Sequence, residues 1–154
     1  MLKVVGVKEP SSAMIEFGEY VLLNVEFDNE RLPAAPFYWR TGDFVGSLVE
    51  VGINRKSGAM AKIGLIAYGE SELLSSAAEY WECVSIAGVP LLNVNDWPSD
   101  RYKDEPGHLT VAESDLCLLM SFSLDKKVDS VYESCGVRFG VNSNCDLIWI
   151  AIKK

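Results

Sequence analysis

Apolar and polar residues alternate with a period of two along much of the chain, a pattern typical of β-strands that bury one face. The alternation is clearest over 49–53, and the turn-forming segment 54–58 separates it from a second apolar run at 59–67. We predict a β-hairpin with a five-residue loop, because this length makes apolar residues face each other across the pair. The expected partners are Val49 with Ile63 and Val51 with Ala61.

A second hairpin is predicted at the end of the chain, where 137–141 and 147–152 flank a polar turn. With Ser143 and Asn144 as a two-residue turn, Phe139 faces Ile148 and Val137 faces Ile150. The returning strand is apolar on both faces, so we expect it in the middle of a sheet or beneath a helix.

The two predicted hairpins resemble each other. Segments 49–54 and 137–142 share the pattern V-x-[VF]-G-[IV]-N, and each is followed by a turn and an isoleucine-bearing return. A duplication explains the likeness, and so does convergence, because any hairpin favours β-branched residues that end in a turn former. The shared glycine is the detail that convergence explains least well.

One helix is predicted near 71–83, with Ser71 as its cap and Glu72 in its first turn. Strand composition is found in segments 20–27, 116–123 and 127–132. Thr110 and Glu113 have capping-box spacing, which predicts a single helical turn. Loops are predicted over 31–42 and 93–107, because both segments contain prolines. The predicted fold is mainly β, an antiparallel sheet or sandwich built from hairpins with one short helix, and α+β is the alternative. We expect a single domain over 1–154.

Composition restricts the class of protein further. The chain has 154 residues, of which 49% are hydrophobic and 23% charged, as in globular proteins that bury a core. Its apolar runs are far shorter than the roughly 20 residues that a membrane span needs. Lys8 and Glu9 follow the N-terminus too closely for the apolar part of a signal peptide. We therefore expect a cytoplasmic protein with no membrane partner.

Residues typical of catalysis or metal binding are few. The four cysteines (Cys83, Cys117, Cys135 and Cys145) form no CxxC pair, and we expect free thiols. His108 is the single histidine, no GxSxG elbow accompanies it, and neither GxGxxG nor GxxxxGK occurs. We expect no enzyme activity, no metal and no cofactor.

The charge of the chain is strongly acidic and unevenly distributed. The 14 basic and 22 acidic residues give −8, which argues against nucleic acid as a partner. Two stretches carry six acids each and no base: Glu9, Glu16, Glu19, Glu26, Asp28 and Glu30, then Glu70, Glu72, Glu79, Glu82, Asp96 and Asp100. Such fields favour a basic protein partner, although acidity can also serve solubility alone.

Aromatic residues beside arginines mark two candidate binding loops, because protein interfaces favour Trp, Tyr and Arg. One loop contains Phe37, Tyr38, Trp39 and Arg40, and the other contains Trp97, Arg101 and Tyr102. We assign Trp81 and Trp149 to the core instead, since they stand on a helix face and a buried strand. Aromatics of the binding loops could also fold inward over the sheet, above all Trp39. The candidate partner-binding residues are Tyr38, Trp39, Arg40, Glu70, Glu72, Asp96, Trp97, Asp100 and Tyr102.

The chain resembles the immunity proteins of bacterial polymorphic and contact-dependent toxin systems. The segments that carry the resemblance are 48–58 with its return 62–66, and 136–142 closing on 147–152. Ser57-Gly58 stands where those families frequently have Thr-Gly. The resemblance implies a cytosolic inhibitor that binds one cognate toxin, often a basic nuclease, and blocks its active site. An alternative is a non-catalytic β-sandwich that binds a small molecule or carbohydrate through Trp39, Trp97 and Tyr102.

Overall fold

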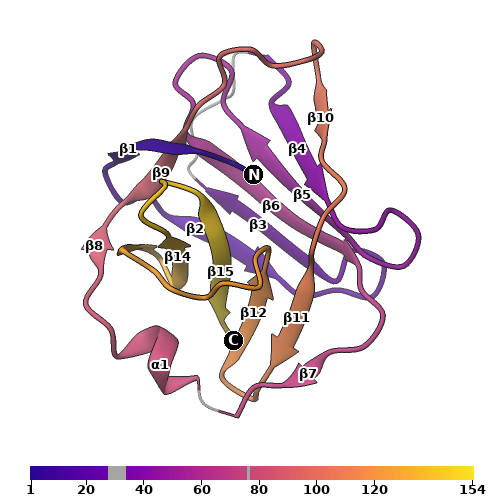
Figure 1. Cartoon of the computed structure of the whole chain (residues 1–154), viewed down its shortest axis with the longest axis vertical. Coiled ribbons are helices and arrows are strands. Elements are labelled where there is room, and N and C mark those ends of the chain that lie inside the picture. Colours follow the sequence, from indigo (N-terminus) through magenta and orange to yellow (C-terminus); the bar gives the residue numbers. More distant parts are fainter. Residues whose placement is uncertain (28–33, 76) are drawn as a thin grey trace.

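Two large β-sheets packed face to face form the body of the protein, as the computed structural model shows for residues 1–27, 34–75 and 77–154 (Figure 1). The fold is mainly β with one four-residue helix, α1 (Ala78–Trp81), so the predicted sandwich of hairpins is confirmed. A small third pair consists of β1 (Val4–Lys8) and β9 (Val89–Leu92), which run antiparallel.

The first sheet has six described strands in the order β10-β4-β5-β6-β3-β2. All neighbours are antiparallel except β10 and β4, which are parallel. Its strands are β2 (Ala13–Glu16), β3 (Leu23–Phe27), β4 (Phe37–Thr41), β5 (Leu48–Ile53), β6 (Met60–Ala67) and β10 (Tyr102–Asp104).

The second sheet has seven described strands in the order β7-β11-β12-β15-β14-β13-β8. The two short edge strands, β7 and β8, run parallel to their neighbours, and the other pairs are antiparallel. Its strands are β7 (Glu72–Leu73), β8 (Ile86–Ala87), β11 (Thr110–Glu113), β12 (Cys117–Ser121), β13 (Ser130–Ser134), β14 (Val137–Val141) and β15 (Leu147–Lys153).

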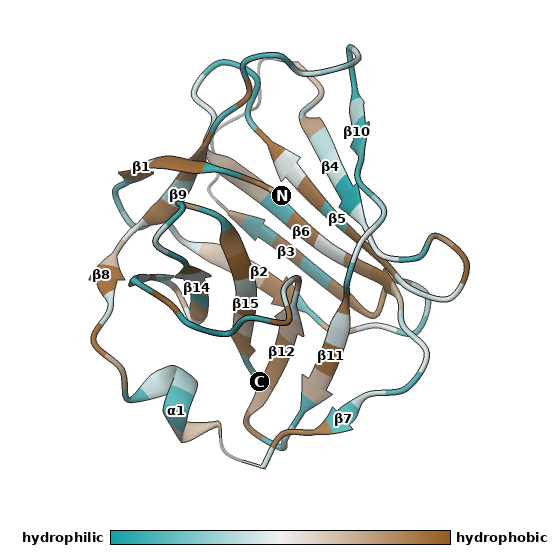
Figure 2. Cartoon of the chain, in the orientation of Figure 1, coloured by the Kyte–Doolittle hydropathy of each residue, from teal (hydrophilic) through white to brown (hydrophobic). Residues whose placement is uncertain are grey.

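A hydrophobic core lies between the two sheets, because the period-two pattern turns one face of each sheet inward. Ring contacts join the two layers: Phe27 meets Phe139 at 5.9 Å, and Trp39 meets Phe122 edge-on at 5.4 Å between ring centroids. The central strand β15 is apolar along almost its whole length, as predicted for a strand buried on both faces (Figure 2).

A second apolar cluster covers the outer face of the seven-stranded sheet. Leu74 and the segment 77–83, which contains α1, pack there on Trp149 and its neighbours, and Tyr80 meets Trp149 edge-on at 5.2 Å between ring centroids. Beneath this segment Arg138 donates hydrogen bonds to the carbonyl oxygens of Tyr80 (2.8 Å) and Cys83 (3.0 Å). The outer face of this sheet is therefore buried by the chain itself.

Both sheets repeat one topology. The run β4-β5-β6-β3-β2 in the first sheet has the same order of successive strands as β13-β14-β15-β12-β11 in the second. The turns match as well: Asn54 receives a hydrogen bond from the N–H of Gly58, and Asn142 receives one from the N–H of Cys145, with positive φ at both donors. The likeness of the two hairpins thus extends to five strands, as a duplication would produce.

The predicted registers of both hairpins are wrong by two residues. Val51 faces Ile63 and Val49 faces Leu65, while in the second hairpin Phe139 faces Ile150. The loops close at Asn54–Ala59 and Asn142–Asp146, and each hairpin has a bulge directly after its glycine. Loop and bulge each shift the pairing by one residue, so the apolar faces stay matched.

Several other elements differ from the predictions. Helix α1 begins only at Ala78, because Glu72 and Leu73 pair with β11 as strand β7. Thr110–Glu113 forms strand β11 rather than a helical turn, and the loop predicted over 93–107 contains strand β10. All four cysteines are free thiols, as predicted.

Candidate functional site

Strand β4 sorts four adjacent side chains onto two faces of the six-stranded sheet. The segment was predicted to be a loop because of its prolines, but Phe37–Thr41 pairs with β5 over its whole length. Alternation then turns Phe37 and Trp39 toward the core, and Tyr38 and Arg40 onto the outer face. The four predicted side chains therefore divide into an inner and an outer pair.

Strand β10 brings a second set of polar and aromatic residues beside β4. Because the two strands are parallel, Tyr102 lies next to Tyr38 and Asp104 next to Arg40. The tyrosine rings are 5.8 Å apart between centroids, and the Arg40 guanidinium lies 4.1 Å from the centroid of the Tyr102 ring. Cation–π contacts of this kind hold planar groups in a fixed arrangement.

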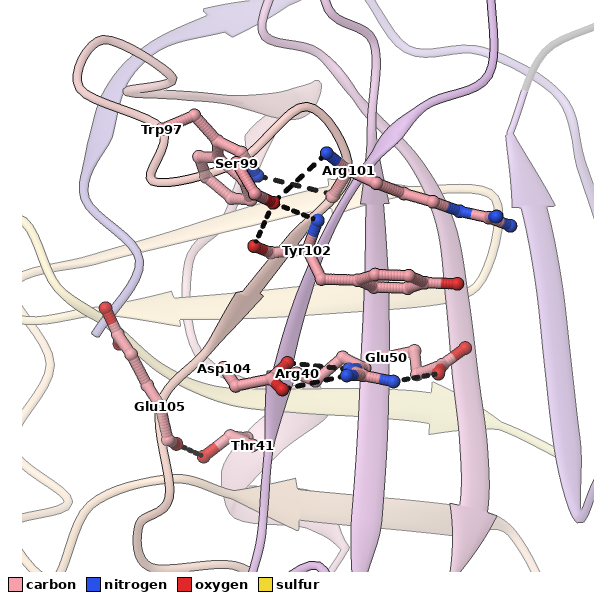
Figure 3. A network of polar contacts seen from close by, with 9 residues as sticks. All are labelled: Arg40, Thr41, Glu50, Trp97, Ser99, Arg101, Tyr102, Asp104 and Glu105. Atoms are coloured by element: carbon pink, nitrogen blue, oxygen red, sulfur yellow. Dashed lines mark hydrogen bonds and ion pairs between the residues drawn. The ribbon is translucent and has the colours of Figure 1, made fainter.

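Arg40 is the polar centre of this arrangement (Figure 3). Its Nε and Nη2 donate hydrogen bonds of 2.7 and 2.8 Å to the two carboxylate oxygens of Asp104, and its Nη1 lies 3.9 Å from Oε1 of Glu50. The hydrogen bonds with Arg40 lower the pKa of Asp104, and the same bonds raise the pKa of Arg40. Bidentate pairing of this kind fixes the guanidinium plane.

Two residues outside the list of candidate partner-binding residues extend the surface: Arg101, which was noted beside Tyr102 in its predicted loop, and Phe44, which was not predicted. Arg101 lies 4.9 Å from the centroid of the Tyr102 ring, and Phe44 lies 6.0 Å from the Arg40 guanidinium. Phe44 is exposed at the tip of the β4–β5 loop and has a positive φ. We call the set Tyr38, Arg40, Phe44, Arg101 and Tyr102 the tyrosine–arginine patch.

The loop that carries Phe44 is held by one carboxylate. Asp43 accepts hydrogen bonds from the N–H groups of Val45, Gly46 and Ser47, and these bonds lower the pKa of Asp43 to about 2. Gly42 precedes it with φ 128°, where an added Cβ would lie 2.3 Å from the carbonyl oxygen of Ser47. The consecutive Gly-Asp at 42–43 was the available signal for this ordered turn.

Trp39, one of the predicted partner-binding residues, lies in the core and does not reach the surface. Its indole Nε1 donates a 2.9 Å hydrogen bond to the Glu105 carboxylate. Partial burial raises the pKa of Glu105, but hydrogen bonds from the amino group of Met1, from Lys103 and from Trp39 outweigh it and lower the pKa to about 2. Trp39 thus belongs to the core and not to the surface that a partner can reach.

The remaining predicted residues lie in three other places. Trp97 is half-buried and stacks on Phe37 at 5.2 Å between ring centroids, so Trp39, Trp97 and Tyr102 form no common platform. Asp96 and Asp100 are exposed in the loop that leads to β10. Glu70 and Glu72 are exposed at β7, on an edge of the other sheet. The structure therefore brings together Tyr38, Arg40 and Tyr102 only.

The acids of the two base-free stretches do not form one surface. Most are exposed, but Glu26 is paired with Lys62 at 3.1 Å on the outer face of the six-stranded sheet. Asp28 and Glu30 lie outside the described residues. The acidic field is thus spread over several loops and edges.

The surroundings of two equivalent arginine–glutamate pairs show how the outer faces differ. The pair Arg40–Glu50 in the first sheet lies where the pair Glu133–Arg138 lies in the second, with the two charges exchanged between the strands. The Arg138 side chain is only 9% exposed under the segment 77–83, whereas that of Arg40 is 26% exposed. The hydroxyls of Tyr38 and Tyr102 have no hydrogen-bond partner within the described residues. The patch can therefore stack on planar groups and hydrogen-bond to a ligand.

No group of residues able to hold a metal ion is present in the part of the chain that the structure describes. Its one described helix is too short to cross a membrane. The chain matches no protein-family model, and it matches no curated protein. Interpretation of the site consequently depends on its own geometry and charge.

Proposed function

We propose that the chain is a cytoplasmic immunity protein that binds a cognate basic bacterial toxin, of the nuclease type, and blocks its active site. The observation that carries the proposal is the tyrosine–arginine patch on an outer sheet face that no other part of the described chain covers. The hairpin resemblance to immunity proteins agrees with this function.

The composition of the patch suits a protein partner. Tyrosine and arginine dominate the residues that contribute most to protein interfaces, because they bury large areas and still form hydrogen bonds. Here the stacking of Arg40 on Tyr102 and its pairing with Asp104 hold the side chains in place before binding. A surface that is ordered in advance loses less conformational entropy when it binds.

The charge of the chain supports a basic partner. A net charge of −8 attracts a nuclease, whose active site is rich in lysine and arginine because it binds phosphates. The mechanism is occlusion: the exposed carboxylates of Asp96 and Asp100, close to β10 in the chain, take the place of substrate phosphates. No catalytic step by this chain is involved.

The experiment uses gene order, since an immunity gene lies directly after its toxin gene. The product of the preceding gene is expressed alone and together with this chain in a sensitive host. We expect growth arrest alone and rescue by the chain, with weaker rescue by the double variant Tyr38→Ala/Tyr102→Ala. The matched control is Leu124→Ala, a loop residue that is 83% exposed on the other sheet. A product that is not toxic, or toxicity that the wild-type chain leaves unchanged, would refute the proposal.

A further inference from the structure

At three of the four edges of the two large sheets, the outermost strand is a short one of two or three residues. β10 pairs with β4, β7 pairs with β11, and β8 pairs with β13, and all three pairs are parallel. The fourth edge is β2, and no strand of the described residues pairs with its outer side. An edge of this kind presents backbone N–H and C=O groups that can pair with another chain.

The repeated topology shows what kind of segment fits this edge. β2 in the first sheet corresponds to β11 in the second. β2 lies beyond β3, which pairs with the central strand β6, and β11 lies beyond β12, which pairs with the central strand β15. Ile15 pairs with Val25 in the first sheet, and Val111 pairs with Met120 at the equivalent place in the second, so Ile15 corresponds to Val111. The next two residues, Glu16 and Phe17, therefore correspond to Ala112 and Glu113.

At the equivalent edge an extended segment runs parallel to the strand. Glu72 lies beside Ala112 and Leu73 beside Glu113, and the N–H of Leu74 donates a 2.8 Å hydrogen bond to the carbonyl oxygen of Glu113. The internal repeat thus supplies a template for an occupant of β2: an extended strand that passes Glu16 and Phe17 in parallel.

The side chains around β2 are apolar and acidic. Met14, Phe17, Tyr20 and Val21 are exposed, and a surface hollow lies at the end of the strand between Glu16, Phe17, Gly18, Val21 and Asn24. Glu16 and Glu19 are exposed and form no ion pair within the described residues, and no lysine or arginine occurs between 9 and 27. Proteins usually protect such an edge with lysine, proline or a bulge.

We propose that β2 binds an extended basic segment of a partner protein by strand addition, parallel to β2. Backbone hydrogen bonds provide affinity, an apolar side chain of the segment fills the hollow beside Phe17 and Val21, and its lysines or arginines face Glu16 and Glu19. The site is separate from the tyrosine–arginine patch and extends the proposed function to a second surface. A second copy of the chain fits less well, because Glu16 and Glu19 of two copies would repel each other.

The test is an NMR titration of the ¹⁵N-labelled chain with an acetylated, amidated peptide, Lys-Val-Lys-Leu-Lys-Val-Lys. We expect the largest shifts at the amides of 13–18 and binding that weakens with salt. One control peptide replaces the lysines by glutamates, which reverses its charge. Another replaces the two inner lysines by prolines, and a third replaces the same two lysines by glutamines, which removes the same charges but keeps the backbone donors. The glutamate and proline peptides should lose binding, and the glutamine peptide should bind more tightly than the proline peptide.

Two chain variants locate the site. Phe17→Lys places at the edge a lysine, whose positive charge repels the basic peptide and which protects the edge against strand addition. We expect at least about tenfold weaker peptide binding. Leu124→Lys makes the same charge change at an exposed residue of the loop between β12 and β13 and should leave binding unchanged. Both side chains are exposed, so both variants should fold, as ¹⁵N spectra without peptide will show.

Three results would overturn the proposal. One is binding that leaves the amides of 13–18 unshifted, and another is equal binding of the proline peptide. The third is a dimer in sedimentation that Phe17→Lys dissociates, because this outcome assigns the edge to a second copy. The peptide titration contains no toxin, so its failure is distinguishable from failure of the rescue experiment.

Discussion

Replacing Gly140 by alanine tests the packing beneath the covering segment 77–83. An added Cβ would lie 2.1 Å from Cε2 and 2.3 Å from Nε1 of Trp149. The indole would have to withdraw by roughly 1.3 Å to reach an ordinary carbon–carbon contact. Trp149 is buried and its ring meets Tyr80 at 5.2 Å between centroids, so the movement disturbs the whole cluster.

The size of the effect follows from this overlap. Inserting a methyl group into a packed core typically costs about 1–3 kcal/mol, and a clash with a rigid ring belongs at the upper end. We therefore expect Gly140→Ala to lower the free energy of unfolding by about 3 kcal/mol. For a chain of 154 residues this corresponds to a decrease in Tm of about 6–12 °C.

Gly52 provides a matched control because it holds the equivalent position in the first hairpin. Its added Cβ would lie 3.0 Å from Cβ of Lys62 and 3.3 Å from Cε1 of Tyr38, both half-buried side chains on an uncovered face. Small shifts relieve these contacts, and alanine also reduces the entropy of the unfolded chain. We expect Gly52→Ala to cost about 1 kcal/mol or less.

Urea unfolding followed by tryptophan fluorescence and far-UV circular dichroism measures both variants. In a double-mutant cycle, Trp149→Leu should make Gly140→Ala much less harmful, because the smaller side chain removes the clash. A Gly140→Ala variant within about 0.5 kcal/mol of wild type would refute the clash with Trp149. Equal destabilisation by Gly52→Ala, or additive effects of the two changes in the cycle, would refute it as well.

Three further changes test the charges. The double variant Asp96→Asn/Asp100→Asn should slow association with the toxin and reduce the salt dependence of the association rate. The control variant Asp115→Asn/Asp129→Asn should change neither. An unchanged salt dependence in stopped-flow binding would contradict electrostatic steering by Asp96 and Asp100. The pKa of Glu105 is about 2 against the ordinary 4.5, so its ionised form stabilises the fold above pH 4.5, and this stabilisation is lost as the pH falls toward 2. Glu105→Gln should therefore flatten the acid limb of the pH–stability curve, and an unaltered limb would show otherwise. Arg138→Met should cost about 3 kcal/mol in urea unfolding and expose 78–85 to hydrogen exchange, since it removes the donor that holds the carbonyls of Tyr80 and Cys83; protection equal to wild type would count against that role.

The mainly β fold was predictable because alternation over 49–53 and 137–141, and the apolar, β-branched run 147–152, indicate strands. The register was not, because each hairpin combines a loop one residue longer than predicted with a bulge after Gly52 or Gly140. A bulge and a changed loop together leave the same residues facing the core. Hydrophobic pattern alone cannot detect such a paired shift.

The short strands could not be predicted from the sequence either. β7, β8 and β10 have two or three residues each, and they form only because a longer strand offers its edge. Local composition says little about them, since their pairing depends on residues far away in the chain. The helix predicted near 71–83 lost its first half for this reason, when Glu72 and Leu73 joined β11.

Part of the candidate site followed from residue type. Tyr38, Arg40 and Tyr102 were selected as typical interface residues, and they lie together because β10 runs parallel to β4. Trp39 was selected by the same criterion, but strand alternation turns it into the core. Phe44 was missed and Arg101 was not included among the candidates, because their places beside Arg40 and Tyr102 depend on the folded loops.

The repeated topology separates this chain from a symmetric dimer of the same shape. In a dimer of identical subunits, every substitution appears twice, so both outer faces and all equivalent edges must change together. Here the two sheets belong to one chain and can acquire different surfaces independently. One sheet has an apolar cover over Trp149, while the other has Tyr38 and Arg40 on its outer face. Two sheets of like topology within one chain can thus be altered one at a time by substitution.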